Sequence, residues 1–540
     1  MINEESKKNY PSSWEIVKLG DFADSEKGKK PKNQQPLQNE EFHLPYIDIE
    51  AFEKSIFKSF TDGEKCVICD NSDFLMVWDG SRSGLVGKGL KGALGSTLIR
   101  INLPMINNLY GYYYLQSKYL EINTRAKGVG IPHVDPFLLW NYDFPIPPVN
   151  EQNRIVDKIE TLFSEVDAGI ENLALAKRQL EQYRQSLLKH AFEGKLTAKW
   201  REEYVEKYGK SLPNADELLE QIQTARQDYY DQQMADWEQA VKSWEEQGKD
   251  GTKPRKPSKL SEIEIFESEG MPQNWIKIST ESTCDFITKG TTPSKENLYQ
   301  SQGEIPFIKV YNLTKNGNLD FSINPTFTNI EIHNNFLSRS KVYPNDILMN
   351  IVGPPLGKVS VVPKDYPEWN INQAIVIFRP LYTNIAYFKF FLLSDVTINL
   401  MEKQAKATAG QLNLTLEICR RLPIPLCSNE EQTLIASILD TKLSVIEKNI
   451  NEIILQLGKA NLLKTSILHK AFQGKLVPQD PNDPPASELL KQIKAEREAK
   501  ALAEKQAKQD KAASKSKAKA KSAKTPKKSK KDEQITLPLQ

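Results

Sequence analysis

Two stretches of the chain, around residues 150–190 and 430–470, place apolar residues at intervals of three and four, which is typical of helices with one buried stripe. The positions are Ile155, Ile159, Leu162, Val166, Ile170, Leu173, Leu180, Tyr183 and Leu187 in the first, and Ile435, Leu439, Leu443, Ile446, Ile450, Ile453, Leu457, Ala460 and Ile467 in the second. Neither helix can bury its stripe alone. We therefore predict that the two helices pack against each other, with the regions before them at opposite ends. The alternative is that each helix packs only on the region before it.

The boundaries of these helices are visible in the sequence. Pro145, Pro147 and Pro148 stand before the first helix, where they forbid an earlier start. Gly194 and Gly474 follow the two ends, and glycine is the usual residue just after a helix.

The region before each helix alternates short apolar runs with turns rich in Gly, Pro and Asn. Runs at 74–78, 97–101 and 374–378 predict buried strands, and 110–124 and 385–404 predict helices. With about 135–150 residues each, the regions 11–145 and 272–423 have the size of single domains. The sequence therefore predicts an α+β chain with two mixed α/β heads.

Eight segments of the first half recur in the same order in the second half, which indicates a duplication. The matched pairs are Pro11-Ser12-Ser13-Trp14 with Pro272-Gln273-Asn274-Trp275, Gly28-Lys29-Lys30-Pro31 with Gly290-Thr291-Thr292-Pro293, Leu44-Pro45-Tyr46-Ile47 with Ile305-Pro306-Phe307-Ile308, Asp73-Phe74-Leu75-Met76 with Asp346-Ile347-Leu348-Met349, Phe144-Pro145-Ile146-Pro147 with Leu422-Pro423-Ile424-Pro425, Glu151-Gln152 with Glu431-Gln432, Ala191-Phe192-Glu193-Gly194-Lys195-Leu196 with Ala471-Phe472-Gln473-Gly474-Lys475-Leu476, and Ala215-Asp216-Glu217-Leu218-Leu219 with Ala486-Ser487-Glu488-Leu489-Leu490.

The repeat divides the chain into six parts. They are a first head (1–148), a first long helix (149–196), a polar helical insert with a linker (197–270), a second head (271–426), a second long helix (427–477), and a C-terminal helix with a basic tail (478–540). We expect the tail to be disordered beyond Lys511, because it is rich in Lys, Ala and Ser and poor in large apolar residues.

Charge is distributed unevenly along the chain. Residues 491–533 hold 16 Lys and Arg against 6 Asp and Glu. Since the whole chain carries +2 and this segment +10, the remainder carries −8. A protein that holds a duplex alone usually has a basic core. If this chain binds DNA, we expect partner subunits to supply much of the phosphate contact, while the tail is either a solubilising segment or a non-specific DNA contact.

Neither an export signal nor a membrane span is expected. The first ten residues are polar, and no run of about 18 apolar residues occurs. Cytoplasmic localisation is therefore the default.

We expect no catalytic residue and no metal site in this chain. The pattern G-x-G-x-x-G at 87–92 lies among further glycines and precedes a strand-like run, which favours a flexible loop over a dinucleotide site. The segment 353–359 lacks the Ser or Thr that a P-loop needs. Cys66 and Cys69 have no second pair nearby, so buried packing is favoured over zinc binding.

Polar loops in each head are the remaining candidates for function. Arg and Lys can contact guanine, and Asn and Gln can contact adenine, in the major groove. An ordinary solvated loop is the alternative for each residue. The candidate DNA-binding residues are Lys29, Lys30, Lys32, Asn33, Gln34, Ser81, Arg82, Ser83, Lys88 and Lys91 in the first head, and Lys289, Thr291, Thr292, Lys295, Lys309, Asn312, Asn350, Lys358, Asn372 and Gln373 in the second.

The order of motifs resembles the specificity subunit of type I restriction-modification systems. The resemblance rests on motifs that occur twice in the same order: the Trp near each head's start, G-x-x-P, I-P-x-I, D-x-L, P-I-P followed by E-Q, the long helix and A-F-x-G-K-L. The resemblance implies that each head is a target recognition domain for one half of a bipartite, asymmetric DNA site. It also implies that the two helices form an antiparallel coiled coil whose length sets the gap between half-sites.

The same resemblance implies double-stranded DNA, two methyltransferase (modification) subunits and restriction/translocase subunits as partners. It implies no cofactor on this chain, with methyl donor, ATP and Mg²⁺ on the partners. Lys29-Lys30 stands where the second head has Thr291-Thr292, and the 79–82 and 352–355 loops differ, so the heads should recognise different half-sites. The competing hypotheses are a stand-alone nuclease or methyltransferase, a stand-alone DNA-binding protein, and a coiled-coil scaffold.

Overall fold

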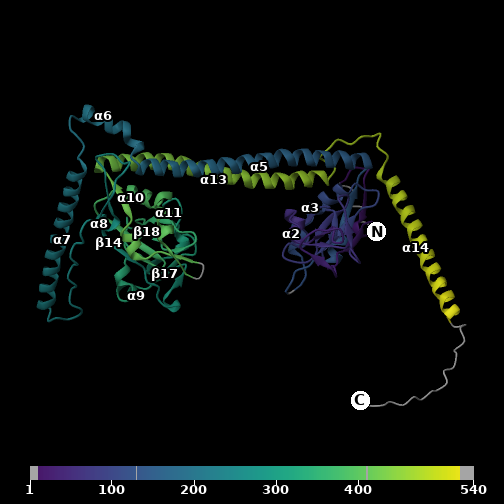
Figure 1. The fold of residues 1–540 in the computed structure, drawn as a ribbon, viewed down its shortest axis with the longest axis horizontal. Helices are drawn as coiled ribbons and strands as arrows, with labels where there is room; N and C mark the ends of the chain where they lie inside the picture. Colours follow the sequence, from purple (N-terminus) through teal and green to yellow (C-terminus); the bar gives the residue numbers. More distant parts are fainter. Residues whose placement is uncertain (1–9, 129, 409–410, 523–540) are drawn as a thin grey trace, which may run out of the picture. The chain divides into compact units, whose positions relative to one another are not determined.

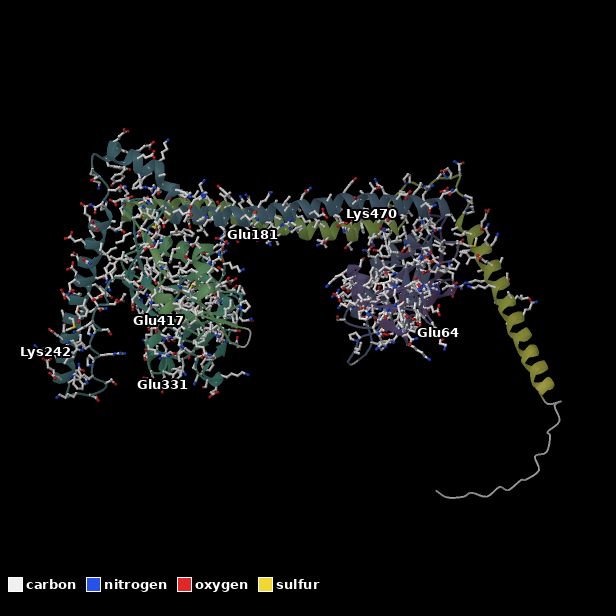
Figure 2. All side chains as sticks on the ribbon, viewed as in Figure 1. Glu64, Glu181, Lys242, Glu331, Glu417 and Lys470 are labelled. Carbon is white, nitrogen blue, oxygen red and sulfur yellow. The ribbon has the colours of Figure 1, made fainter. Side chains whose placement is uncertain are left out.

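The computed structural model describes residues 10–128, 130–408 and 411–522. These residues form two compact units. The first consists of residues up to 172 with residues from 456 on, and the second of residues 173–455. Each unit contains one head and a segment of each long helix (Figure 1), and the side chains of both units are drawn in Figure 2.

The first head has three sheets. They are the antiparallel pair β1 (Glu15–Lys18) and β11 (Asp143–Ile146), the antiparallel sheet β2 (Asp24–Lys27)-β10 (Leu98–Asn102)-β7 (Phe74–Val77)-β8 (Val86–Lys88), and the mixed sheet β3 (Gln34–Gln35)-β5 (Phe60–Thr61)-β4 (Leu44–Ile47)-β9 (Gly92–Leu94)-β6 (Ile68–Cys69), in which β4 and β9 are parallel. The helices are η1 (Leu19–Asp21), α2 (Ile49–Lys54), α3 (Asn108–Thr124) and α4 (Pro136–Trp140).

The second head repeats this plan. The β1–β11 pair corresponds to β13 (Ile276–Ser279) with β25 (Pro423–Leu426), joined by β12 (Ile265–Phe266). The other sheets are β14 (Cys284–Lys289)-β22 (Ile375–Pro380)-β18 (Ile347–Asn350)-β20 (Val359–Val361), the mixed sheet β15 (Tyr299–Gln300)-β17 (Thr326–Thr328)-β16 (Ile305–Ile308)-β21 (Asn370–Ile371), and β19 (Val352–Gly353)-β24 (Gln411–Asn413)-β23 (Lys406–Thr408). Its helices are α8 (Thr280–Thr283), η3 (Lys295–Asn297), η4 (Val310–Asn312), α9 (Ile330–Asn334), η5 (Ser338–Ser340), α10 (Ile385–Leu392), α11 (Asp395–Gln404) and α12 (Leu416–Arg420).

The long helices α5 (Val149–Phe192) and α13 (Asn429–Ala471) both contribute a segment to the buried cluster of each unit. In the first unit, Ile155 and Ile159 of α5 share one buried cluster with Ile467 of α13, and Lys464 donates to the carboxylate of Asp167. The start of one helix thus meets the end of the other. The two helices are therefore antiparallel in this unit.

The second unit has the complementary pairing. Leu187 and Leu188, near the end of α5, lie in one buried cluster with Ile435 and Leu439, near the start of α13. In each unit, the buried cluster contains residues of both helices and of the head. Helix-on-helix packing and helix-on-head packing, which we treated as alternatives, therefore occur together. The placement of the heads at opposite ends stays a prediction.

The predicted helix over 385–404 is in fact two helices. Ser394 lies between α10 and α11, where its hydroxyl donates to the carbonyl of Phe391 at 2.8 Å and accepts from the backbone N–H of Thr397 at 3.4 Å. A serine that caps a new helix in this way ends the earlier one. The sequence pattern missed the break because apolar spacing continues across it.

The prediction of a loop at 87–92 was wrong at both ends, and residues 89–91 alone connect two strands. Gly87 lies in β8, which pairs with β7, and Gly92 begins β9. A β-carbon on Gly89 would lie 2.1 Å from the carbonyl oxygen of Asp70, and one on Gly92 would lie 2.4 Å from that of Pro45. The glycines are therefore required by close backbone approach in the sheets.

Three further helices follow the repeats. α6 (Ala198–Tyr208) comes after the short turn η2 (Lys195–Thr197), α7 (Ala215–Glu246) is the long helix of the insert, and α14 (Ala486–Ser522) is its counterpart in the second repeat. The expectation of disorder beyond Lys511 is overturned up to Ser522, where α14 ends. Ala and Lys are good helix formers, and no Pro or Gly interrupts them before Pro526. The expected disorder after Ser522 lies outside the described residues.

Candidate nucleic-acid interface

Each head is attached to a long helix through a buried glutamate. In the first unit, Nε1 of Trp14 donates to Oε2 of Glu151 at 3.0 Å, and in the second Nε1 of Trp275 donates to Oε2 of Glu431 at 3.0 Å. Glu151 is 1% exposed and Glu431 is fully buried. Buried carboxylates are costly unless hydrogen-bonded, so these pairs fix where each head meets its helix.

The glutamine that follows each glutamate makes the same bonds in both units. Gln152 accepts from the backbone N–H of Asn107 at 2.9 Å and donates to the carbonyl of Pro147 at 2.9 Å. Gln432 accepts from the N–H of Asn384 at 3.0 Å and donates to the carbonyl of Cys427 at 2.9 Å. The repeated Glu-Gln pair therefore ties a head helix and the end of the last head strand to the start of each long helix.

The second oxygen of the buried glutamate has different partners in the two units. Oε1 of Glu151 accepts from the amide of Gln479 at 2.6 Å. Oε1 of Glu431 accepts from the hydroxyl of Thr197 at 2.6 Å and from the guanidinium of Arg201. One carboxylate thus has only neutral donors, whereas the other has a cation.

The A-F-x-G-K-L segment that ends each helix packs on the head of the other repeat. Gly194, with φ of 73°, lies against Pro272 of the second head, and Gly474, with φ of 68°, lies against Pro11 of the first. A β-carbon would approach each proline ring to 2.4 Å, so both glycines are required by conformation and by space. The two repeats are therefore interleaved, since each unit contains the start of one and the end of the other.

Lysines without partners lie after the edge strand β2 of the first head. Lys29, Lys30 and Lys32 are exposed and have no ion pair among the described residues, whereas Gly28 is buried beside the carbonyl oxygens of residues 94 and 95. Of the next candidates, Asn33 donates to Asp62 at 3.0 Å and Gln34 lies in β3. The predicted lysine cluster is thus held by a tight glycine contact and faces solvent.

The second candidate loop of the first head is bound to its own unit. Arg82 pairs with Glu53, and Nζ of Lys88 lies 2.8 Å from Oε1 of Glu160 in α5. Ser83 is buried, and the carbonyl of Ser81 accepts from Asn123. Lys91 is exposed and has no ion pair within the described ranges.

Two predicted base-contacting residues of the second head have structural roles instead. Asn312 is 1% exposed and donates to the carbonyls of Asp320 and Ile323. Asn350, equally buried, donates to the carbonyls of Val352 and Pro355 and accepts from the N–H of Lys358. Both amides have their partners within the fold, so they have no group left for a base.

Other predicted residues of the second head come together at the end of β21. Oγ1 of Thr292 accepts from the backbone N–H of Gln373 at 3.2 Å, which places the loop 290–293 beside Asn372 and Gln373. Gln373 is exposed, and Oδ1 of Asn372 has no hydrogen-bond partner among the described residues. Lys289 and Lys295 are exposed nearby in sequence, whereas Lys309 lies 6.0 Å from the ring centre of Tyr311.

Arg339 joins this group and was missed in the sequence. Its Nε donates to Oγ1 of Thr291 at 3.2 Å from the turn η5, 48 residues away along the chain. Arg339 makes no ion pair among the described residues and is exposed. The flanking serines alone do not mark it, because only the tertiary contact brings it to the recognition loop. We call Thr291, Thr292, Arg339, Asn372 and Gln373 the threonine-arginine patch.

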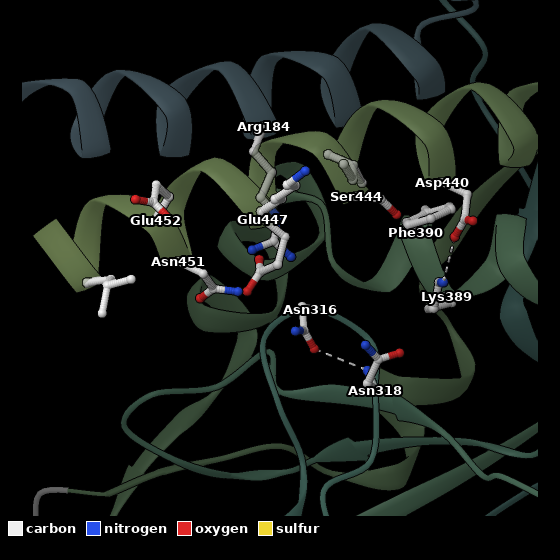
Figure 3. A pocket seen from close by; sticks show the side chains of 13 residues that line it. Arg184, Asn316, Asn318, Lys389, Phe390, Asp440, Ser444, Glu447, Asn451 and Glu452 are labelled. Atoms are coloured by element: carbon white, nitrogen blue, oxygen red, sulfur yellow. Dashed lines mark hydrogen bonds and ion pairs between the residues drawn. The ribbon is translucent and has the colours of Figure 1, made fainter.

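A hollow of about 640 Å³ lies in the second unit between α13, Arg184 of α5 and the 315–318 loop (Figure 3). Sequence spacing placed Tyr183 in the buried stripe of α5, but Tyr183 is 49% exposed. Arg184 points inward instead and donates to the carbonyl of Lys315. Burial lowers the pKa of Arg184, and Glu447 and Asp395 oppose that effect. This hollow is part of the contact between head and helices.

The cysteine pair is placed partly as predicted. Cys69 is buried, its thiol donates to the carbonyl of Gly92, and burial raises its pKa to about 12, whereas Cys66 is half-buried. Within the described ranges, no group of three or more His, Cys, Asp or Glu side chains could hold a metal ion. In the same part of the chain, no helix is both long and apolar enough to cross a membrane.

Mildly acidic pH is expected to stabilise the first unit through Glu151. Burial raises the pKa of this carboxyl above the ordinary glutamate value, and hydrogen bonds from Trp14 and Gln479 offset part of the rise. Between the ordinary and the raised pKa, the folded state binds more protons than the unfolded state, so the free energy of unfolding falls as pH rises through that window.

Hydrogen exchange of β1 and β11 amides at several pH values measures this effect, with Glu151→Gln as the control that removes it. An equal pH dependence in wild type and Glu151→Gln would contradict the assignment. The hydrogen bond from Arg154 lowers the pKa of the Asp483 carboxyl. Its effect on stability therefore falls at a lower pH than the range in which Glu151 titrates.

Together these features define a tandem-repeat protein whose two α/β heads are each bonded to a pair of helical segments and carry different polar loops. A family model described as the type I restriction modification DNA specificity domain matches residues 11–175 and 272–456. These ranges include both heads and the first part of each long helix. The chain belongs to this family of type I restriction-modification DNA specificity proteins.

Named relatives agree with the family. The MjaVIII specificity subunit of Methanocaldococcus jannaschii is 34% identical over 174 residues, which are 31% of this chain and 41% of that subunit. The match therefore spans about two fifths of that relative. The EcoBI specificity subunit of Escherichia coli is 24% identical over 505 residues, 90% of this chain and 93% of that subunit.

A solved chain shares the fold. It comes from work on the complex assembly and conformational transition of the type I R-M system, and it has a TM-score of 0.57 and 17% identity. The match covers 86% of this chain and 99% of that chain.

Proposed function

We propose that the two heads bind the two halves of one bipartite, asymmetric DNA site and so provide sequence specificity to a type I restriction-modification complex. The observation that carries this proposal is the pairing of one repeated scaffold with two unlike loop sets. The first head presents the free lysines of the 28–32 loop, and the second presents the threonine-arginine patch at the matching G-x-x-P position.

Methylation and cleavage are assigned to partner subunits, together with methyl donor, ATP and Mg²⁺. Apolar side chains on α13 support docking of such subunits, which we take to be two modification subunits and restriction/translocase subunits. Val445, Ile454 and Leu455 are 51–56% exposed in the second unit, and Leu462 and Leu463 are 70% and 50% exposed in the first. Adjacent exposed apolar residues, here the pairs 454–455 and 462–463, are a feature of protein interfaces. We place the assembly in the cytoplasm.

Mapping methylated adenines in host DNA tests the proposal. Wild type is expected to give one motif made of two specified blocks around an unspecified spacer. Exchanging the 28–32 and 290–295 loop sequences should change the recognised bases without changing the spacer, because the helices are untouched. A single contiguous motif, or no motif that depends on this chain, would contradict the proposal, and the second result would favour a scaffold.

A further inference from the structure

The helix α14 is anchored on the first head at its beginning. Ala486 donates its backbone N–H to the carbonyl of Ser13 at 3.0 Å, and Leu489 and Ile493 are buried in the main cluster of the unit. Arg497 and Lys500 then lie 3.6 Å and 3.3 Å from the carboxylate of Asp24, the first residue of β2. The helix continues to Ser522, a further ~33 Å at 1.5 Å per residue.

The equivalent helix of the first repeat, α7, has the same kind of anchor and the opposite charge. Leu218 and Ile222 are buried against the second head. α7 contains nine acidic and two basic residues, whereas α14 contains five acidic and eleven basic residues. A shared attachment with reversed charge indicates that the exposed parts of the two helices have different partners.

α7 has a partner inside its own unit. Trp237 donates to the carbonyl of Pro254 at 3.0 Å, and Nζ of Lys256 lies 5.3 Å from the centre of its ring. Trp244 donates to the carbonyl of Gly251 at 3.2 Å and has Lys253 over its ring at 5.9 Å. The basic linker therefore folds back along the acidic helix and is held there by its two tryptophans.

After Lys500, α14 has no tryptophan of this kind and no following linker that the structure describes as folded back on it. Residues 501–522 contain seven lysines, two acidic residues and no aromatic residue, and their only large apolar residue, Leu502, is 62% exposed. A helix without an apolar stripe has little to bury against a protein surface. Dense positive charge without apolar contact is instead the composition that favours a polyanion.

The anchor places the beginning of this segment beside the strand that leads to the free lysines of the first head. Asp24 begins β2 and Lys29 lies five residues further along the chain, which is at most about 17 Å at ~3.4 Å per residue. One turn of duplex DNA measures ~34 Å. A duplex held at the 28–32 loop is therefore within reach of the helix that Asp24 holds.

We propose that the lysine-rich part of α14, residues 501–522, binds the phosphate backbone of double-stranded DNA beside the half-site of the first head. This inference rests on the proposed function, since it assumes that the first head is on DNA. The contact carries no base information, because phosphates are the same in every sequence. Its seven lysines and two acidic residues give it a net charge of +5, whereas the chain outside residues 491–533 carries a net charge of −8.

The test replaces Lys505, Lys508, Lys511, Lys515, Lys517, Lys519 and Lys521 with glutamine in the full chain. Glutamine has a helix propensity close to that of lysine, and the buried anchor is untouched. Binding is measured over about 50–200 mM salt on a random duplex and on a duplex with the mapped site, for the chain alone and with its modification subunits. Each lysine–phosphate interaction that is removed should reduce the slope of log K against log salt by about 0.9. If three of the seven lysines contact phosphates, the slope should fall by about 2.7.

The matched control replaces the same seven lysines with arginine, which keeps the charge and should keep the slope. The inference predicts equal losses of affinity for random and target DNA, with the methylated motif unchanged. An unchanged slope while the target site is still bound would overturn it and leave the proposed function standing. An unchanged slope with impaired subunit assembly would also overturn it, and would identify an acidic protein surface as the partner. If wild type shows no preference for the target, the proposed function fails instead.

Discussion

Replacing Glu431 with glutamine is expected to destabilise the second unit by about 3 kcal/mol, whereas Glu151→Gln should cost the first unit no more than about 1 kcal/mol. The two glutamates are repeat equivalents and both bind a tryptophan N–H. They differ in the partner of the other oxygen. Glu431→Gln removes the counter-charge of Arg201, whose side chain is only 16% exposed, while Glu151 has the neutral amide of Gln479.

The measurement is local, because a chain of two units need not unfold in one step. Hydrogen exchange of β13 amides measures opening of the second unit, and exchange of β1 amides measures opening of the first. Arg201→Gln combined with Glu431→Gln should recover part of the loss, since the uncompensated charge is then gone as well. If Glu431→Gln and Glu151→Gln destabilise their units equally, Arg201 is solvated well enough not to need the charge of Glu431.

Replacing Arg339 with alanine is expected to relax the second half-site at one base pair. An arginine that donates two hydrogen bonds to guanine discriminates against other bases by about 1–3 kcal/mol, or roughly 5- to 150-fold. Arg339 is held at the recognition loop by the hydroxyl of Thr291 and has no carboxylate partner among the described residues. Its guanidinium is therefore positioned and still has donors free.

Two controls separate base contact from phosphate contact. Arg339→Lys keeps the charge but loses the fork geometry, so it should relax the same base pair while leaving the salt dependence of binding near that of wild type. Thr291→Val should weaken discrimination by less, because it removes only the group that positions Arg339. If Arg339→Ala instead weakens binding equally on every sequence and lowers the salt slope by about 1, the residue contacts phosphate.

The repeat and its scaffold could be predicted from the chain alone because they depend on local chemistry. Apolar spacing in 155–187 and 435–467 depends only on 3.6 residues per turn, and Pro147 and Gly194 act on the backbone around them. Trp14, Glu151 and their copies were visible as matched motifs, although nothing in the sequence showed that each Trp donates to the Glu that follows it by more than a hundred residues. That bond depends on where the sheet ends bring the two segments.

Recognition residues were predicted less well, and burial is the reason. Asn312 and Asn350 have the residue type that contacts adenine, but the fold uses their hydrogen-bonding groups internally. Lys88 forms a surface ion pair with Glu160, and Arg184 rather than Tyr183 lies on the inner face of α5. Polar residues in loops look alike in a sequence until neighbouring segments decide which of them stay free.

The sequence by itself determined that this protein is a duplicated α/β head followed by a long helix, because helix periodicity, prolines, glycines and repeated motifs act over short distances. The tertiary structure alone decided that the repeats interleave, so that each helix begins on its own head and ends on the other. It also decided that Arg339 stands beside Thr291 and that one buried glutamate has a cation while its twin has an amide. These outcomes depend on contacts between segments far apart in the chain, and no local pattern encodes which segments will meet.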